Sequence, residues 1–307
     1  MNIFEAWFRI IRPPIVFISC LGALIGLFNS AIFLEIQPSY FQMLMIILGA
    51  FFLAAGLMLH NDVTDLESDK INRPYKPLPS GVIGEKTAFY SGIFFMIISI
   101  IIGLMINIKD TGIINWKCGL LTLILVVVGL YYNHYGKYHG IVGNIAVAFG
   151  VGAIPFWGSI AAFPWRLDLM LTLAVALAIQ EVGREIMVCA GDYKGDLEAG
   201  FKTFPVQMGR KKSMYVALIF YLGFIPLFPL PAYDYLNLGV PQVFGNLYLL
   251  GGTLLAFSLI ITWFLTYLAV LKGDEKKIWK AFERYERVGT RTMIIVFQIF
   301  ILIEIFY

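Results

Sequence analysis

Nine apolar runs separated by polar connections make up most of this chain. An α-helix rises about 1.5 Å per residue, so about 20 apolar residues cross the ~30 Å hydrocarbon layer of a bilayer. The pattern therefore predicts an all-α integral membrane protein. The nine expected transmembrane helices occupy residues 14–34, 40–60, 87–107, 113–132, 141–162, 168–188, 213–231, 246–271 and 288–306.

The composition agrees with a membrane location. Hydrophobic residues make up 59% and charged residues 14% of the 307 positions, and the mean hydropathy is +0.79. So few polar side chains cannot cover a water-soluble globule. The first run follows the letters RIIRPP and has no small-residue cleavage site, so we expect it to be retained as a helix.

Basic residues orient the predicted helices, because cytoplasmic connections are enriched in lysine and arginine. With the N-terminus inside, all 23 basic residues except Lys109, Lys117 and Arg166 fall on the cytoplasmic side. The net charge of +3 therefore reports topology and indicates no nucleic-acid partner. The connections after the second and sixth runs combine many acidic and basic residues, which predicts an active site on the cytoplasmic side of the cell membrane.

The connection at residues 61–81, NDVTDLESDKINRPYKPLPSG, places three oxygen-bearing side chains at a spacing of four. On a helix, Asn61, Asp65 and Asp69 line one face over about 12 Å. Glu67 lies about 200° around the helix from each aspartate and is expected to point away. Burying a carboxylate in hydrocarbon costs about 2.5–3.5 kcal/mol. This face is therefore expected to meet a watery cavity, a cation or the cytoplasm.

A second copy of this pattern occupies residues 192–209, DYKGDLEAGFKTFPVQMG. Asp192 and Asp196 repeat the spacing of Asp65 and Asp69, and basic residues, a proline and a glycine follow each pair. Four predicted spans separate the two copies. We therefore expect two related four-helix units plus a ninth helix, with both acidic helix ends directed at a central cavity, as in repeat-built membrane proteins.

Two facing carboxylate pairs form an oxygen-rich site for a hard divalent cation. Mg²⁺ prefers one or two carboxylates, several waters and the phosphate oxygens of a substrate. Basic residues among the acids can neutralise phosphate charge that the metal does not. The sequence therefore predicts a diphosphate ligand, with contacts from Arg73, Lys76, Lys137, Arg184, Lys194 and Lys202.

At these residues the chain resembles the UbiA-type intramembrane prenyltransferases. NDVTDLESD with NRPYKPLPSG is similar to the first signature of that superfamily, and DYKGDLEAGFKTFP is similar to the second. YYNHYGKYHGIVGN resembles its tyrosine and lysine connection, and RIIRPP, with Arg12 and Pro13, resembles its N-terminal arginine motif. The resemblance covers nearly the whole chain, which implies a single domain over residues 1–307.

The resemblance implies transfer of an isoprenyl group from a prenyl diphosphate to a lipophilic acceptor within the membrane lipids. It also implies two Mg²⁺ ions, for which Mn²⁺ substitutes, held by Asn61, Asp65, Asp69, Asp192 and Asp196. The implied diphosphate contacts are Arg12, Asn61, Arg73, Lys76, Lys137, Arg184, Lys194 and Lys202. The implied catalytic residues are Asp65, Asp192, Lys137 and Tyr132.

Two acceptor classes stay open at this point. The connection around Lys137 looks most like that of archaeal members that prenylate a glycerol phosphate ether lipid. One departure also admits an aromatic, quinone-type precursor: Val188, Cys189 and Gly191 stand where ether-lipid relatives commonly carry a lysine and further acids. Separately, Lys76 stands where an arginine is usual, which keeps the charge but loses a planar bidentate donor.

A cation-coupled membrane transporter is the alternative function. Paired acids in a repeat could bind a coupling cation. A transporter site normally lies near the middle of the membrane, whereas these acids are predicted at cytoplasmic helix ends among lysines and arginines. The enzyme is therefore the favoured interpretation.

Overall fold

Helices form every regular element of the computed structural model, which describes residues 1–162, 170–232 and 244–306. The α-helices are α1 (Ile3–Ile10), α2 (Pro13–Phe33), α3 (Tyr40–Thr64), α4 (Leu66–Asn72), α5 (Glu85–Met105), α6 (Ile108–Thr111), α7 (Trp116–His134), α8 (Ile141–Ala161), α9 (Leu171–Glu198), α10 (Phe204–Met208), α11 (Arg210–Leu227), α12 (Asn246–Lys272), α13 (Glu275–Ala281) and α14 (Arg291–Phe306). Two short 3₁₀ helices are η1 (Gly136–Tyr138) and η3 (Leu230–Ala232), and η4 (Phe282–Thr290) is a π-helix.

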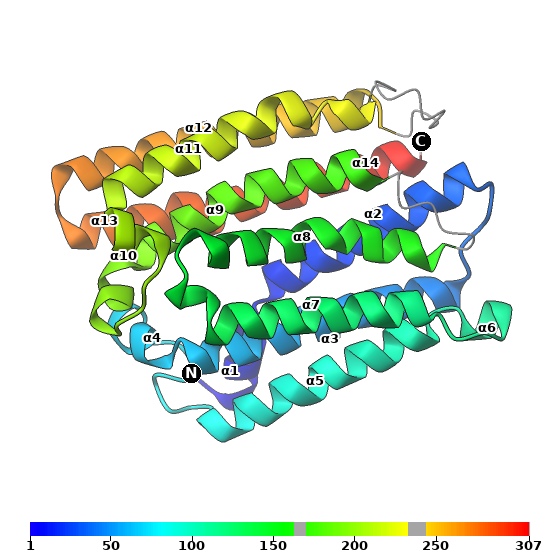
Figure 1. The fold of residues 1–307 in the computed structure, drawn as a ribbon, viewed down its shortest axis with the longest axis horizontal. Coiled ribbons are helices and arrows are strands. Elements are labelled where there is room, and N and C mark those ends of the chain that lie inside the picture. Colours follow the sequence, from blue (N-terminus) through cyan, green and yellow to red (C-terminus); the bar gives the residue numbers. More distant parts are fainter. Residues whose placement is uncertain (163–169, 233–243, 307) are drawn as a thin grey trace.

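The long helices run side by side along one direction (Figure 1). Contacts between successive long helices close a ring in the order α2, α3, α5, α7, α8, α9, α11, α12 and α14, and α14 returns to α2. The first unit, α2 to α7, and the second, α8 to α12, repeat the same order of neighbours. This arrangement confirms the expected all-α fold of two four-helix units with one appended helix.

Eight helical segments of the described residues are long and apolar enough to cross a membrane. The sixth expected span, residues 168–188, lies mostly on α9. Residues 168 and 169 of that span fall outside the described part of the chain, as does Arg166. This helix is long but does not qualify by composition, because Glu181, Arg184 and Glu185 interrupt its apolar half. The predicted count of nine is therefore close but not confirmed, because the sixth expected span has a polar interior face.

Close packing of α2 against α8 depends on two glycines. A Cβ atom added to Gly26 would lie 1.9 Å from the carbonyl oxygen of Pro155, and one added to Gly158 would lie 1.9 Å from that of Ala23. Only glycine permits backbones to approach this closely. In lipid the hydrophobic effect does not drive helices together, so helix contact depends on the close packing that small residues allow. The two helices that begin the two units are thereby held together.

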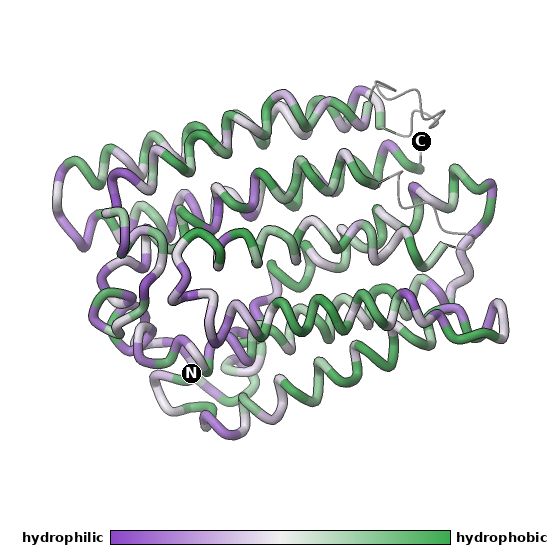
Figure 2. Tube along the Cα trace, in the orientation of Figure 1, coloured by the Kyte–Doolittle hydropathy of each residue, from purple (hydrophilic) through white to green (hydrophobic). Residues whose placement is uncertain are grey.

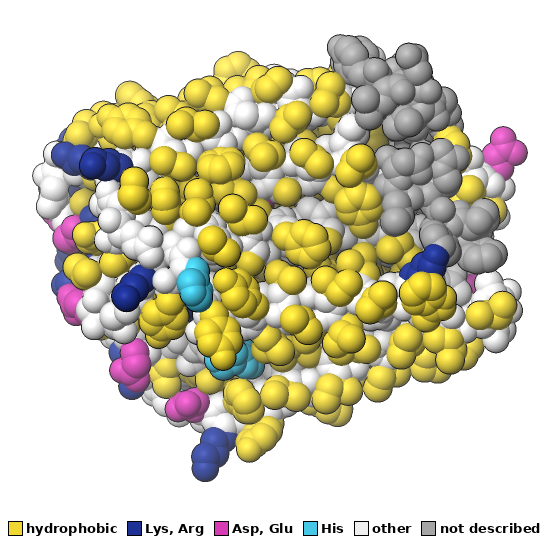
Figure 3. All heavy atoms as spheres, in the orientation of Figure 1, with side chains coloured by type: hydrophobic (Ala, Val, Ile, Leu, Met, Phe, Trp, Pro, Cys, Tyr) yellow, Lys and Arg dark blue, Asp and Glu magenta, His cyan; other side chains and the backbone are white. Residues whose placement is uncertain are grey.

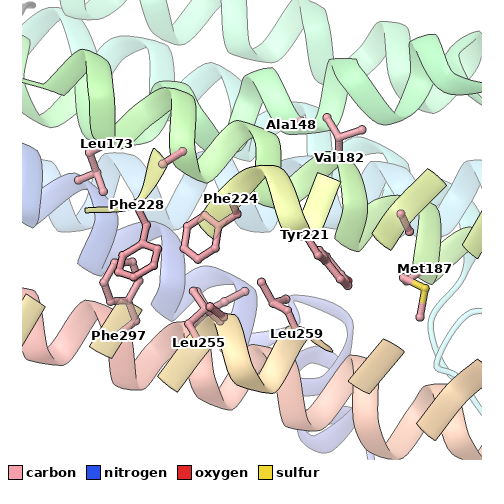
Figure 4. Packing of buried hydrophobic residues seen from close by; sticks show 14 of the residues in the cluster. Ala148, Leu173, Val182, Met187, Tyr221, Phe224, Phe228, Leu255, Leu259 and Phe297 are labelled. Atoms are coloured by element: carbon pink, nitrogen blue, oxygen red, sulfur yellow. The ribbon is translucent and has the colours of Figure 1, made fainter. Parts of the chain in front are cut away.

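Apolar side chains fill the bundle and also cover its sides. Tyr221 and Phe224 of α11, and Phe228 directly after it, face Leu255 of α12 and Phe297 of α14 (Figure 4). The flank seen in Figure 3 is covered by hydrophobic side chains, whereas charged side chains gather toward the ends of the molecule. This distribution is that of a multi-pass membrane protein.

Polar residues concentrate at one end of the bundle. The short helices α4, α10 and α13 lie at this end with the N-terminus (Figure 1), and hydrophilic residues follow the same region (Figure 2). Both acidic motifs belong to it, since α3 leads into α4 and α9 leads toward α10. The fold therefore brings the two motifs to the same end, as their repeated pattern predicts.

Candidate active site

The first motif keeps its helical spacing across a break between two helices. α3 ends at Thr64 and α4 begins at Leu66, with Asp65 between them at φ −90° and ψ 1°. The amide of Asp65 still donates to the carbonyl of Asn61 (2.9 Å), and that of Asp69 donates to the carbonyl of Asp65 (2.8 Å). The three predicted ligands therefore follow one another along a nearly continuous helical path.

The phase predicted for this motif is confirmed. Asn61 and Asp69 are buried, with exposed fractions of 6% and 2%. The Glu67 side chain is 70% exposed and pairs with Lys70 at 2.6 Å. The acidic face is thus distinct from the solvated face of the same helix.

Hydrogen bonds join the second motif directly to the first. Ser68 on α4 donates to Asp196 on α9 at 2.8 Å, and Thr203 donates to the other carboxylate oxygen at 3.3 Å. Asn72 donates to the carbonyl of Asp192 (3.1 Å) and accepts from the amide of Gly195 (3.2 Å). The ends of α4 and α9 are therefore fixed against each other, with both aspartates of the second motif at their junction.

Lysines and arginines bridge the acids of the two motifs. Arg73 binds Asp69 (3.0 Å), Asp192 and Glu283 (3.1 Å). Lys76 binds Asp69 at 2.5 Å. In the same region, Lys137 from η1 binds Asp65. These contacts gather three predicted cations around the predicted metal ligands.

The electrostatics of this cluster are those of buried, densely packed charge. Burial lowers the pKa of the Arg73 guanidinium, but Asp192, Asp69 and Glu283 outweigh burial and raise that pKa above its ordinary value. Burial raises the pKa of Asp69, although Lys76 and Arg73 oppose the shift. Arg73 therefore stays charged while Asp69 carries unfavourable negative charge, a condition that a divalent cation would relieve.

Arg12 reaches this cluster from the start of α2. It has a left-handed backbone, with φ 52°, directly before Pro13. Its guanidinium binds Asp62 and donates to Asn61 at 3.2 Å. A non-glycine residue held in this conformation costs energy and is often found at functional sites. The predicted N-terminal arginine thus lies beside the first motif.

A second polar network lies deeper in the bundle. Arg184 contacts Glu181 (2.5 Å), Glu185 (3.2 Å) and Glu286 (3.4 Å). Tyr132 donates to Glu185 at 2.7 Å, and the Lys137 ammonium lies 5.8 Å from the centroid of the Tyr132 ring. The structure therefore places Tyr132 between this network and the aspartate cluster, and it surrounds Arg184 with carboxylates.

Two predicted diphosphate contacts lie apart from the cluster. Lys194 is exposed and is 3.9 Å from Glu198, whose side chain is 48% exposed. The Lys202 side chain is also exposed, while its backbone amide donates to the carbonyl of Lys137 at 3.0 Å. A role for either side chain in binding phosphate stays a prediction.

Sequence reasoning missed three charged residues of the cluster. Asp62 is 3% exposed and binds both Arg12 and Lys76 (3.2 Å). Glu283 and Arg287 on η4 bind each other at 3.1 Å, and Arg287 binds Asp192 at 2.6 Å. Their i, i+4 spacing is a visible signal of a charged helical face, but it does not reveal which part of the chain that face meets.

A pocket of about 370 Å³ opens beside these residues. Its walls come from the start of α2, the first motif and the η4–α14 junction. Arg12, Asp62, Arg73, Lys76 and Arg287 all line it. The charged cluster is therefore accessible to a ligand.

The donor set fits Mg²⁺ in combination with a phosphate ligand. Carboxylate oxygens are the ligands that Mg²⁺ prefers. Within residues 1–162, 170–232 and 244–306, no three His, Cys, Asp or Glu side chains are arranged to hold a metal by themselves. Asp69 and Asp192 each contact cations instead. Such a site suits an ion that takes one or two protein carboxylates and completes its shell with water and phosphate.

Comparisons with known proteins identify the family and the fold of this chain. The sequence profile of the UbiA prenyltransferase family matches residues 16–296. A protein from Pyrococcus horikoshii named digeranylgeranylglyceryl phosphate synthase is 33% identical over 224 residues, which span 73% of this chain and 75% of that protein.

Two solved structures share the fold. A UbiA homologue from Aeropyrum pernix superposes with a TM-score of 0.72 at 17% identity, over 94% of this chain and 97% of the other. A UbiA homologue from Archaeoglobus fulgidus bound to GPP and Mg²⁺ superposes with a TM-score of 0.66 at 16% identity, over 98% of this chain and all of the other.

Proposed function

Because this chain belongs to the UbiA prenyltransferase family, we propose that it transfers a prenyl group from a prenyl diphosphate to a glycerol phosphate ether lipid in the presence of Mg²⁺. Membership in an enzyme family removes the support for a cation-coupled transporter. The observation that carries the proposal is the junction of the two acidic motifs, where Ser68 binds Asp196 and Arg73 bridges Asp69 and Asp192.

The substrates follow from the chemistry of the relatives. The name of the Pyrococcus protein describes a glyceryl phosphate that carries two geranylgeranyl groups. A transferase that adds the second group needs geranylgeranyl diphosphate and a glyceryl phosphate that already carries one. The Archaeoglobus homologue was solved with a shorter prenyl diphosphate, GPP, and with Mg²⁺. We therefore assign the donor as a prenyl diphosphate and the acceptor as a monoprenyl glyceryl phosphate.

The residues of the two motifs would hold the diphosphate between them. Asn61, Asp65 and Asp69 on one side, and Asp192 and Asp196 on the other, are the proposed ligands for Mg²⁺. When bound, this ion supplies positive charge that stabilises the leaving diphosphate. The two groups of ligands suit two ions, one at each motif, and Mn²⁺ is the proposed substitute for Mg²⁺.

Cations of the chain complete this phosphate site. Arg73, Lys76 and Lys137 contact the aspartates of the first motif. With Mg²⁺ held by those aspartates, the same ammonium and guanidinium groups would be free to donate to phosphate oxygens. Tyr132, beside Lys137, faces the site with its ring and can stabilise positive charge that develops on the allylic carbon.

The transfer forms one carbon–oxygen bond and breaks another. The allylic carbon separates from the diphosphate oxygen, and the glyceryl hydroxyl oxygen bonds to that carbon. The hydroxyl proton is transferred to the departing diphosphate, so charge and atoms balance. The buried position of the cluster limits the access of water, which would otherwise capture the allylic cation.

The proposed test measures products from purified protein. Labelled geranylgeranyl diphosphate is incubated with a monoprenyl glyceryl phosphate or with an aromatic quinone precursor, and extracted products are identified by mass. We expect the diprenyl glyceryl phosphate as the main product. Transfer to the aromatic acceptor alone would contradict the proposed acceptor, and no transfer to either would contradict the proposed function.

A further inference from the structure

The pocket beside the two motifs is strongly cationic. Its charged lining comprises two carboxylates, Asp62 and Glu283, and six basic side chains: Arg9, Arg12, Arg73, Lys76, Arg287 and Arg291. A partly enclosed pocket with this excess of positive charge favours an anion. Its volume of about 370 Å³ suits a phosphate with a small glyceryl unit.

Arg291 differs from the other cations of the pocket. Arg12, Arg73, Lys76 and Arg287 all bind carboxylates of the cluster, whereas Arg9 binds Glu5 near the surface. In the described part of the chain, Arg291 forms no ion pair and no side-chain hydrogen bond, although it is half-buried. Glu286 attracts Arg291 from beyond ion-pair distance but already contacts Arg184, so an anionic ligand would supply the direct partner that the half-buried Arg291 guanidinium lacks.

The apolar lining of the pocket indicates that this anion belongs to a lipid. Pro14, Val288 and Ile295 line the pocket together with the charged residues. Val288 is 63% exposed, and the pocket lies where α2 and α14, two membrane-spanning helices, contact each other. A ligand with a charged head and an apolar chain could therefore place its head among the arginines while its chain extends toward the bilayer.

On the basis of the proposed function, we propose that this pocket binds the phosphate of the acceptor lipid and that Arg291 is its main counter-charge. Arg73 and Lys76 line the pocket and also contact Asp69 of the first motif. The head of the acceptor would thus lie close to the prenyl diphosphate, with only one or two side chains between them. The glyceryl hydroxyl of the acceptor would be directed toward the reacting carbon. The pocket would also select acceptors that carry a phosphate.

The test compares Arg291→Gln with Arg284→Gln in the purified full-length protein. Arg284 lies on the neighbouring helix η4, is exposed and does not line the pocket, so its substitution controls for the loss of one positive charge. For Arg291→Gln we expect the KM for a monoprenyl glyceryl phosphate to rise about tenfold or more, since a charged hydrogen bond is lost. The KM for the prenyl diphosphate should change less than about twofold. Arg284→Gln should match wild type in both values.

A phosphate-free monoprenyl glycerol provides the second arm. Wild type should use it poorly, and Arg291→Gln should use it as well as wild type does. If Arg291→Gln does not fold, Arg291→Lys replaces it, with a smaller rise in the acceptor KM because the planar donor pair is lost. In Arg291→Gln, equal changes in the two KM values, or an unchanged preference for the phosphorylated acceptor, would overturn this inference but not the proposed function. A wild-type protein without any transfer would overturn the proposed function and the inference together.

Discussion

Ser68 on α4 donates a hydrogen bond of 2.8 Å to Asp196 on α9, and this contact joins motifs that are 128 positions apart in the chain. Neither residue is exposed by more than 6%. A buried carboxylate requires hydrogen-bond partners, and here one partner comes from the other motif. The two acidic helix ends therefore form one site whose geometry depends on both units of the fold.

Gly195 tests how much activity depends on this junction. A Cβ atom at Gly195 would lie 2.2 Å from Nδ2 of Asn72, whereas one at Gly150 would have no neighbour within 4 Å. We expect Gly195→Ala to displace the Asn72 side chain and break its hydrogen bonds to α9, to lower Tm and to reduce transfer, at a stability cost of about 1–3 kcal/mol. Gly150→Ala, also within a helix, should leave both unchanged or raise Tm slightly. Equal melting curves and equal rates for the two variants would contradict a tight junction.

The phased aspartates give a sharper prediction about the chemistry. Asp65→Asn and Asp192→Asn keep side-chain volume but remove the negative charge that the metal requires, so each should lower the transfer rate by about 100-fold or more. Glu67→Gln and Glu198→Gln remove exposed charges on the same two helices and should change the rate less than about threefold. Rates are measured at equal purified yield and Tm. Similar losses in all four variants would mean that bulk negative charge is sufficient.

Much of this site follows from local sequence patterns. The spacing of Asp65 and Asp69, repeated by Asp192 and Asp196, predicts two helical acidic faces at one end of the bundle. The outward position of Glu67 follows from the same 100° step per residue. Such features are predictable because they depend on the geometry of one helix.

The remaining parts depend on contacts between distant segments. Asp62 lies one residue from Asn61, outside the predicted face, yet Arg12 and Lys76 approach it from two other segments. Glu283 reaches Arg73 across 210 positions. No periodicity encodes these partners, because they arise from how the ring of helices closes and where α14 returns to α2. Arg184 shows the same limit, since its surrounding carboxylates come partly from η4.

Metal removal tests the proposed role of Mg²⁺. The proposed mechanism has Mg²⁺ held by the carboxylates of the two motifs, so we expect transfer to require added metal. Excess EDTA should abolish product formation, and Mg²⁺ or Mn²⁺ in excess of the chelator should restore it. Product formation is followed with labelled prenyl diphosphate. Full turnover in EDTA, with metal absent by elemental analysis, would contradict the proposed mechanism.

The orientation of the site in the membrane is tested by cysteine labelling. Ser80 is exposed in the loop that ends the first motif, at the polar end of the bundle. Gln37 is exposed in the connection between α2 and α3, at the opposite end of both helices. The distribution of lysine and arginine predicts that Ser80 lies on the cytoplasmic side.

We therefore expect a membrane-impermeant thiol reagent to label Ser80→Cys in inside-out vesicles and Gln37→Cys in intact cells. Background labelling should be low because Cys118 and Cys189 are buried, and the half-buried Cys20 lies within the apolar span of α2, which a membrane-impermeant reagent does not enter. The two variants form a matched pair, since each should react only where the other does not. The reverse pattern would place the active site on the outer face, and with it the N-terminus, because α1 and the start of α2 lie at the same end as Ser80.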